Sequence, residues 1–213
     1  MSRVRIQNFT ISLDGFGTGE GQSLEAPFGH AGHRLHDWMF ATRFGHREVL
    51  GQPGGSDGFD NAMAERSGPG IGAEIMGANK FGPPGWQDDP EWHGWWGANP
   101  PFHTPTFVLT HRPLESMEME GGTTFHFLAA SPEEALAVAK DAAAGQDVRI
   151  GGGPTVVRDF LAAGLVDHLH VVQVPVLLGR GVRLWDGLEG LDDQYEVETV
   201  STRSGVTHIT FTR

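Results

Sequence analysis

The stretch that decides the fold reads Val148-Arg149-Ile150-Gly151-Gly152-Gly153-Pro154-Thr155-Val156-Val157. Its apolar start predicts a strand, three glycines end that strand, and the proline suits the first turn of a helix. A loop without Cβ atoms lets a phosphate reach main-chain N–H groups at the positive end of the helix dipole. The stretch therefore predicts a nucleotide-binding turn. A plain tight turn is the alternative, because neither of the common glycine-rich phosphate motifs is matched.

Length and composition favour one compact domain. The chain has 213 residues, of which 38% are hydrophobic, and this suffices for a core. No apolar stretch approaches the roughly 20 residues of a membrane span, and the first residues lack the apolar centre of a signal peptide. We therefore expect a cytoplasmic protein. The absence of cysteine excludes disulfides, thiolate chemistry and cysteine-ligated zinc.

The charge balance narrows the class of partner. The chain carries 27 acidic and 15 basic residues, a net charge of −12, which disfavours nucleic-acid backbones and anionic membranes. Any bound phosphate must be held locally by a few cations. Lys80 and Lys140 are the two lysines of the sequence, and Lys80 directly follows a predicted strand.

Predicted strands alternate with predicted helices. Strands are expected over 4–13, 71–76, 106–110, 123–128, 147–150, 168–174, 195–202 and 206–212. Helices are expected over 32–43, 59–66 and 154–163, with a further helix that starts at Pro132 and is stopped by Gly145. Ser131 and Glu134 predict a capping box for this further helix. The unit 147–174 predicts two parallel strands that are adjacent or separated by one strand. The last two strands predict an antiparallel hairpin at a sheet edge. The glycine-rich residues 14–19 predict a mobile loop.

Residues 82–105 form an unusual segment. Six prolines and four tryptophans lie in it: Pro83, Pro84, Pro90, Pro100, Pro101, Pro105, Trp86, Trp92, Trp95 and Trp96. We expect a long structured loop covered by its own aromatic side chains, either part of a pocket wall or a subunit contact. Disorder is the alternative, which the tryptophans disfavour.

Three predicted strands end in groups suited to phosphate. The glycines at 151–153 offer backbone donors, residues 77–80 offer a glycine-led turn with an ammonium, and residues 110–112 offer a hydroxyl and a guanidinium. Ligands of open α/β sheets lie beyond the carboxyl ends of the strands. A pyrophosphate and a separate ribose phosphate would use all three groups, because a guanidinium grips phosphate bidentately. This favours NADP(H) over NAD(H).

Four stretches carry a resemblance to a known family: Ser12-Leu13-Asp14-Gly15, Ile75-Met76-Gly77-Ala78-Asn79-Lys80-Phe81, Ile150-Gly151-Gly152-Gly153, and Gly164-Leu165-Val166-Asp167-His168-Leu169 with Pro175-Val176-Leu177-Leu178-Gly179-Arg180-Gly181. They resemble the dihydrofolate reductase-like family, in its riboflavin-biosynthesis reductase (RibD C-terminal domain) branch. The last stretch is the most specific. The resemblance covers nearly the whole chain outside residues 82–105.

The resemblance implies a three-layer α/β fold. Its central sheet has about eight strands, mostly parallel, with an antiparallel C-terminal edge, and NADPH lies across it. Residues 1–213 would form a single domain with an insertion at 82–105. The Gly152–Gly153 peptide is expected to be cis. A hydrophobic edge and the aromatic insertion favour a homodimer.

The resemblance also implies a set of cofactor-binding residues. The turn at 77–80 would meet the pyrophosphate and the adenosine side, residues 110–112 the ribose phosphate, and residues 150–156 the pyrophosphate and the nicotinamide, with the loop from Asp14 covering the nicotinamide. The full set is Asp14, Gly15, Gly77, Ala78, Asn79, Lys80, Thr110, His111, Arg112, Ile150, Gly151, Gly152, Gly153, Pro154, Thr155 and Val156.

The implied chemistry is hydride transfer to an electrophilic C=N or C=O carbon of a pterin- or pyrimidine-like heterocycle. Asp37 is the nearest match to the family's proton-handling acid, with His36 one position away. The closest reaction is reduction of 5-amino-6-(5-phosphoribosylamino)uracil, whose ribosyl phosphate Arg43 or Arg158 would grip. A dihydrofolate-directed or promiscuous reductase, or a module that binds NADPH without catalysis, are the alternatives.

Simpler interpretations stand beside these. His30, His33 and His36 have the spacing of metal ligands on a helix, but no second ligand set completes them, and we expect no metal site. His168 and His170 alternate on a predicted strand and are expected to be structural. An ordinary surface charge is the alternative interpretation for each of Asp37, Lys80 and Arg112.

Overall fold

The computed structural model describes residues 2–213, and within them nine strands form one sheet in the order β10-β11-β8-β1-β7-β3-β4-β6-β5. These strands are β1 (Val4–Ser12), β3 (Ile71–Gly77), β4 (Pro105–Leu109), β5 (Met117–Glu118), β6 (Thr124–Leu128), β7 (Asp147–Gly152), β8 (His168–Val174), β10 (Glu196–Ser201) and β11 (Thr207–Thr212). Strands β1, β7, β3, β4 and β6 pair in parallel, whereas β8, β11 and β10 pair antiparallel. The prediction of a mostly parallel α/β sheet with an antiparallel C-terminal edge is confirmed.

The chain folds into two compact units. One unit consists of the chain up to Ile6 together with Gly70–Asp167, and the other of Gln7–Pro69 together with His168–Arg213. The helices are α1 (Asp37–Phe40), α2 (Arg43–Glu48), α3 (Phe59–Glu65), α4 (Ala78–Phe81), α5 (Pro132–Ala142) and α6 (Pro154–Ala162). No helix among residues 2–213 has the length and apolar character needed to cross a membrane.

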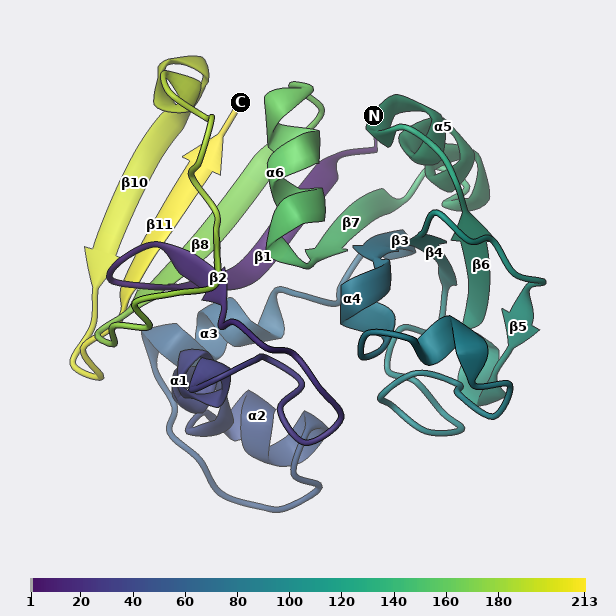
Figure 1. Cartoon of the computed structure of the whole chain (residues 1–213). Helices are drawn as coiled ribbons and strands as arrows, with labels where there is room; N and C mark the ends of the chain where they lie inside the picture. Colours follow the sequence, from purple (N-terminus) through teal and green to yellow (C-terminus); the bar gives the residue numbers. More distant parts are fainter. Residues whose placement is uncertain (1) are drawn as a thin grey trace. The chain divides into compact units, whose positions relative to one another are not determined.

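The first unit is built on the parallel strands β7, β3, β4 and β6. Helix α5 packs against β3, β4 and β7, while α6 packs against β7 and β3 (Figure 1). The predicted capping box is present: the Ser131 hydroxyl accepts from the amide of Glu134, whose carboxylate accepts from the amide of Ser131. This reciprocal pairing satisfies two amides at the start of α5.

The proline- and tryptophan-rich insertion is an ordered part of the first unit. Trp86, which is 4% exposed, packs edge-to-face on Phe81 and also contacts Phe127. Trp92 and Trp96 are half-buried against the same cluster, which includes Phe125 of β6. The expectation of a structured loop covered by its own aromatic side chains is confirmed, and these aromatic rings serve as core.

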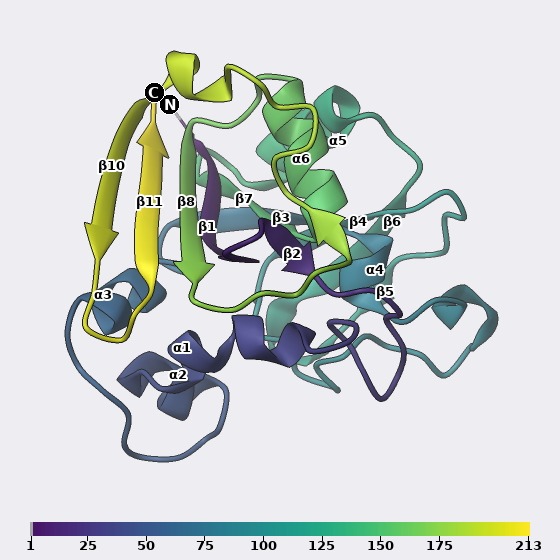
Figure 2. The ribbon, with the colours of Figure 1, turned by 60° about the vertical axis from the view of Figure 1, so that its left-hand side comes forward.

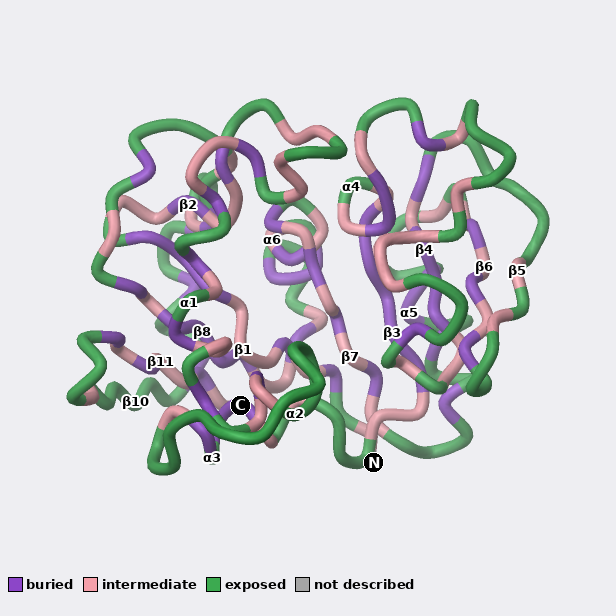
Figure 3. Tube along the Cα trace, turned by 90° about the horizontal axis from the view of Figure 1, so that it is seen from below, coloured by how far each residue is buried: buried purple, intermediate pink, exposed green. Residues whose placement is uncertain are grey.

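The second unit ends in the predicted hairpin. Strands β10 and β11 pair from Glu196↔Thr212 to Ser201↔Thr207, and β11 pairs with β8 (Figure 2). All six residues of β10 are exposed (Figure 3), because this strand lies at the edge of the sheet.

Two expectations for the second unit were wrong. The helix predicted over 32–43 is divided into a 3-10 turn at Gly32–Leu35, then α1 and α2. Thr42 divides the last two because it is extended and its hydroxyl accepts from the amide of Gly45, which makes it the N-cap of α2. The loop predicted over 14–19 contains strand β2 (Phe16–Thr18), which pairs with β9 (Val182–Arg183).

A buried hydrogen-bond chain also crosses the second unit. The backbone amide of Asn8 donates to Nδ1 of His170, so the neutral His170 ring carries its proton on Nε2. This Nε2 donates to Nδ1 of His208 (3.0 Å). His208 then donates from Nε2 to the Asp60 carboxylate (2.9 Å). Both rings are almost fully buried and stack in parallel. The prediction that His170 is structural agrees with this arrangement.

Acid should weaken this unit through His170. Burial, together with the nearby His208, His168 and Arg66, lowers the pKa of His170 from 6.5 to about 3. Between these two pH values His170 binds a proton in the unfolded chain and stays neutral in the folded chain. The free energy of unfolding therefore falls as the pH drops below 6.5. The loss at about pH 5 is about 2 kcal/mol. Urea unfolding at about pH 7 and 5 measures it; equal losses in the native chain and His170→Gln would contradict the assignment.

Candidate functional site

Three strand ends of the first unit meet at one edge of the sheet. The parallel register pairs Gly77 of β3 with Leu109 of β4, and Met76 of β3 with Gly152 of β7. The residues that follow each strand therefore lie side by side. The groups predicted to bind phosphate at 77–80, 110–112 and 151–156 are brought together by this pairing.

The turn after β7 is shaped by glycine at two positions. The Gly152–Gly153 peptide is cis, as the resemblance implied. A Cβ placed on Gly153 would meet no atom within 4 Å, so the space above this residue is open. A Cβ on Gly77 would instead lie 2.8 Å from Cγ2 of Val156. Glycine at 77 therefore lets the start of α6 approach β3.

The start of helix α6 lacks the local groups that stabilise the start of α5. The N-cap residue is Gly153, which has no side chain to cap the helix, and no acidic residue lies in the first turn. Helix α5 has both a capping box and two glutamates at the corresponding place. The first amides of a helix attract negative charge. Pro154 is buried in this turn and Thr155 is exposed, so the turn is open to an anion from outside the chain.

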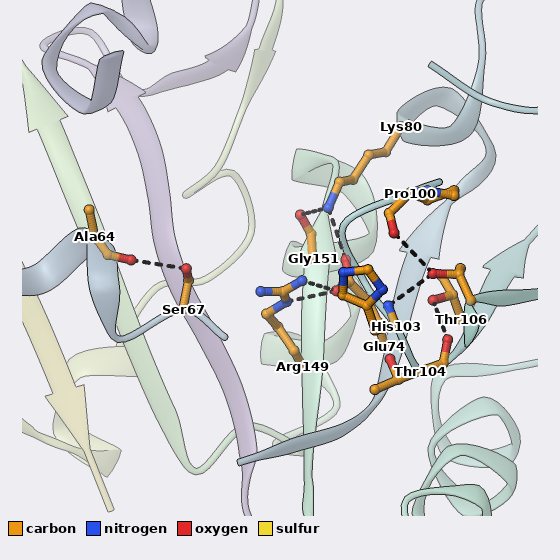
Figure 4. A network of polar contacts seen from close by, with 11 residues as sticks. Ala64, Ser67, Glu74, Lys80, Pro100, His103, Thr104, Thr106, Arg149 and Gly151 are labelled. Atoms are coloured by element: carbon orange, nitrogen blue, oxygen red, sulfur yellow. Dashed lines mark hydrogen bonds and ion pairs between the residues drawn. The ribbon is translucent and has the colours of Figure 1, made fainter. Parts of the chain in front are cut away.

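A buried carboxylate lies directly beneath this turn. Glu74 of β3 is fully buried, and Arg149 of β7, its register partner, binds one carboxylate oxygen through Nε (2.7 Å) and Nη2 (Figure 4). Lys80 donates to the other oxygen (3.1 Å) and to the carbonyl of Gly151 (2.9 Å). A Cβ on Gly151 would lie 2.1 Å from the carboxylate of Glu74, so glycine is required there as well.

Electrostatics keep Glu74 charged. Burial alone would raise the pKa of its carboxyl group, but the charges and hydrogen bonds of Arg149 and Lys80 outweigh burial and lower it. Burial lowers the pKa of Lys80, and Glu74 opposes that shift. The predicted cofactor residue Lys80 is thus engaged with the protein and is half-buried, so it contacts Gly151 from the protein side of the turn.

Glu74 and Arg149 were not predicted from the sequence to belong to the site. Both lie inside predicted strands, 71–76 and 147–150, of which the first was expected to be buried, and a charged side chain in a buried strand needs a partner. Two opposite charges in two predicted strands were the available signal. Their pairing depended on the order β7-β3, which no local pattern gives.

The third strand end is joined to the insertion. Thr110 is buried, and its hydroxyl accepts from the amide of Arg112 (3.2 Å) and from the side chain of Gln87 (3.3 Å). Arg112 is exposed, and its Nη2 lies 2.7 Å from the carboxylate of Asp88. Each of these two charges favours the other, which raises the pKa of Arg112 and lowers that of Asp88. Gln87 and Asp88 were not predicted.

The remaining residues of the predicted cofactor set on this edge have varied surroundings. Ala78 is half-buried, Asn79 and His111 are exposed, and Ile150 is buried in the core. Their assignment to a cofactor stays a prediction.

Asp14 and Gly15 lie in the second unit, where Asp14 fastens a turn. Its carboxylate accepts from the Ser12 hydroxyl (2.6 Å) and from the amides of Leu178 (3.1 Å) and Gly179 (2.7 Å). Burial acts to raise the pKa of Asp14, but these hydrogen bonds lower it to about 2. Gly15 has φ 85°, as its tight turn requires. Asp14 thus joins the two stretches that carried much of the family resemblance.

The predicted catalytic residues also lie in the second unit. Asp37 is the exposed first residue of α1, and half-buried His36 precedes it, with its ring 4.2 Å from that of Phe28. Arg43 pairs at the surface with Asp57 and Glu65, and Arg158 is a half-buried residue of α6 in the first unit. Within residues 2–213, no group of three or more His, Asp or Glu side chains could hold a metal ion.

The edge of the first unit offers hydrogen-bond donors to anionic groups. It combines the uncapped amides of α6, the open space above Gly153 and the exposed guanidinium of Arg112. These are donors for two separate anionic groups.

Comparisons with known proteins identify the family and the fold. The family model of the RibD C-terminal domain matches residues 4–210. Among solved structures, a putative riboflavin biosynthesis protein from Shewanella sp. PV-4 has a TM-score of 0.58 at 20% identity, over 100% of this chain and 99% of that one. A pyrimidine reductase-like protein from Corynebacterium diphtheriae has a TM-score of 0.53 at 13% identity, over 99% and 91% of the two chains.

The comparisons also include an Enterococcus faecalis dihydrofolate reductase complexed with NADP(H) and RAB-propyl, with a TM-score of 0.48 at 17% identity, over 100% of this chain and 96% of that one. No curated protein matches the chain. The first two structures share the fold, and the family model spans both compact units. The chain therefore belongs to the RibD C-terminal domain family, a family of reductases with the dihydrofolate reductase-like fold.

Proposed function

We propose that this protein is an NADPH-dependent reductase of a pterin- or pyrimidine-like heterocycle. The observation that carries the proposal is the start of α6, which follows an open glycine turn and has neither a capping side chain nor an acid in its first turn. In this chain α5 shows how a helix start is satisfied internally. An anion bound from outside would give α6 the same stabilisation.

In this proposal the pyrophosphate is bound by the amides of the first turn of α6 and by the backbone at Gly153. Lys80 acts as a positioning residue, because its ammonium holds the carbonyl of Gly151. Arg112 binds the ribose phosphate. Gly77 lets α6 come close to β3. A bound reduced nicotinamide would supply the hydride.

The substrate that the family most directly suggests is 5-amino-6-(5-phosphoribosylamino)uracil. Membership of the RibD C-terminal domain family supports a substrate of this class. Loss of the reduced-nicotinamide absorbance with a panel of ribosylaminopyrimidines and dihydropterins tests the activity directly. Turnover with dihydropterins alone would favour the dihydrofolate-type alternative, and tight NADPH binding without turnover the non-catalytic one.

We also propose that residues 1–213 act as a single domain that assembles as a homodimer in the cytoplasm. The family match across both units supports the single domain. The exposed edge strand β10, with Val197 and Val200 at 45% and 40% exposure, supports pairing with a second copy. Sedimentation equilibrium measures the assembly state, and cell fractionation the location.

Thr155→Asp should separate binding from stability. A carboxylate in the first turn of α6 favours the helix by about 0.3–1 kcal/mol. The same charge repels a pyrophosphate, so NADPH affinity should fall about tenfold or more. Calorimetric titration with NADPH and thermal unfolding measure the two effects, with Thr155→Asn as the neutral control. Equal NADPH affinity in both variants would contradict an anion site at this helix.

Arg112→Gln should discriminate between the two dinucleotides. Hydrogen bonds to a charged group contribute about 1.5–3 kcal/mol, so NADPH affinity should fall about ten- to hundredfold. NADH lacks the ribose phosphate, and its affinity should change by less than about twofold. Titrations of both dinucleotides check this. An equal loss for NADPH and NADH would remove Arg112 from the ribose-phosphate site.

Asp37→Asn should lower turnover and spare cofactor binding. General acid catalysis contributes typically about 10²–10⁴-fold, so kcat should fall by that order. NADPH affinity should stay within about twofold of the native value. Steady-state kinetics across pH, with exposed His33→Asn as a neighbouring control, measures the change. A native pH profile and rate in Asp37→Asn would assign Asp37 to the solvent-facing surface of α1.

A further inference from the structure

The insertion contributes a carboxylate to the proposed ribose-phosphate site. Asp88 ends the 3-10 turn Trp86–Asp88 and lies 2.7 Å from Nη2 of Arg112. The proposed function assigns no role to Asp88 or to the rest of the insertion. Both side chains are well exposed, at 59% for Arg112 and 67% for Asp88. The partner of the exposed guanidinium is thus an anion that belongs to the protein.

The position of Asp88 is fixed by its neighbours in the sequence. Trp86, two residues earlier, is 4% exposed and locked between Phe81 and Phe127. Gln87 donates from Nε2 to the hydroxyl of Thr110, two residues before Arg112. These two anchors hold the backbone of Asp88 beside residues 110–112. The carboxylate cannot move far away when another anion approaches Arg112.

We propose that Asp88 is a specificity-determining residue that weakens the preference of this site for 2′-phosphorylated dinucleotides. This inference rests on the proposed function. An exposed ion pair is readily exchanged, so a 2′-phosphate can replace the carboxylate on Arg112. The displaced carboxylate nevertheless stays within a few ångströms of the phosphate and repels it. An unphosphorylated ribose meets no such repulsion.

The charge arrangement supports this role. Asp88 and Arg112 each stabilise the charged form of the other, which lowers the pKa of Asp88 and raises that of Arg112. Both groups are therefore ionised at neutral pH. The side chain of Gln87 is neutral and bound to Thr110, so the repulsion from residues 87 and 88 comes from Asp88. The native protein should consequently prefer NADPH over NADH by a smaller factor than Arg112 alone would give.

Asp88→Asn tests the inference by equilibrium binding. Removal of one negative charge a few ångströms from a doubly charged phosphate should raise NADPH affinity about tenfold at low salt. NADH affinity should stay within about twofold, and the gain for NADPH should shrink at high salt. Glu91→Gln is the matched control, because Glu91 is an exposed acid of the same insertion. Calorimetric titrations with NADPH, NADH, adenosine 2′,5′-bisphosphate and 5′-AMP measure the effect.

The possible results separate the two levels of the proposal. A selective gain for NADPH and the bisphosphate in Asp88→Asn, absent from Glu91→Gln, supports the role of Asp88. Dinucleotide binding with an unchanged NADPH-to-NADH ratio in Asp88→Asn overturns that role and leaves the proposed function intact. An equal gain in Glu91→Gln reduces the effect to net charge and also overturns it. If the native protein binds neither dinucleotide, both the proposed function and the inference are wrong.

Discussion

The candidate site depends on the ion pairs that Glu74 makes beneath it. A fully buried carboxylate is costly unless it is paired, and Arg149 and Lys80 pair it from two sides. Because Lys80 also holds the carbonyl of Gly151, the same interaction that offsets the burial of Glu74 fixes the glycine turn. The buried ion pairs of Glu74 thus support the glycine turn at which an anionic ligand is proposed to bind.

Local patterns predicted much of the fold because they are read from neighbouring residues. The capping box at Ser131, the strand over 168–174 and the hairpin at 195–212 each contain their own physical reason. The division of the 32–43 helix depended on the Thr42 side chain, whose choice between helix interior and N-cap is not visible in apolar spacing. The strand ends at 77, 110 and 151 were predicted individually, and the parallel register brought them together. Glu74 and Arg149, by contrast, required the strand order.

In the aromatic insertion, hydrophobic packing sets the position of two polar side chains at the sheet edge. Its tryptophans join Phe81, Phe125 and Phe127 in one cluster and fix the path of a segment that has little regular structure. Hydrophobic burial therefore positions Gln87 and Asp88 beside Thr110 and Arg112. The composition of residues 82–105 predicted a structured aromatic loop. It gave no indication of which polar residue between them would meet the sheet edge.

The contact between Gly77 and Val156 couples two positions that are far apart in the chain. The missing Cβ of Gly77 makes room for a methyl group of Val156, so the depth at which α6 sits on β3 is set by the combined size of these two residues. A larger residue at 77 would lift the helix, and a smaller one at 156 would let it sink. During divergence the two positions are thus expected to covary. Each accepted change at one position limits the side-chain volume allowed at the other.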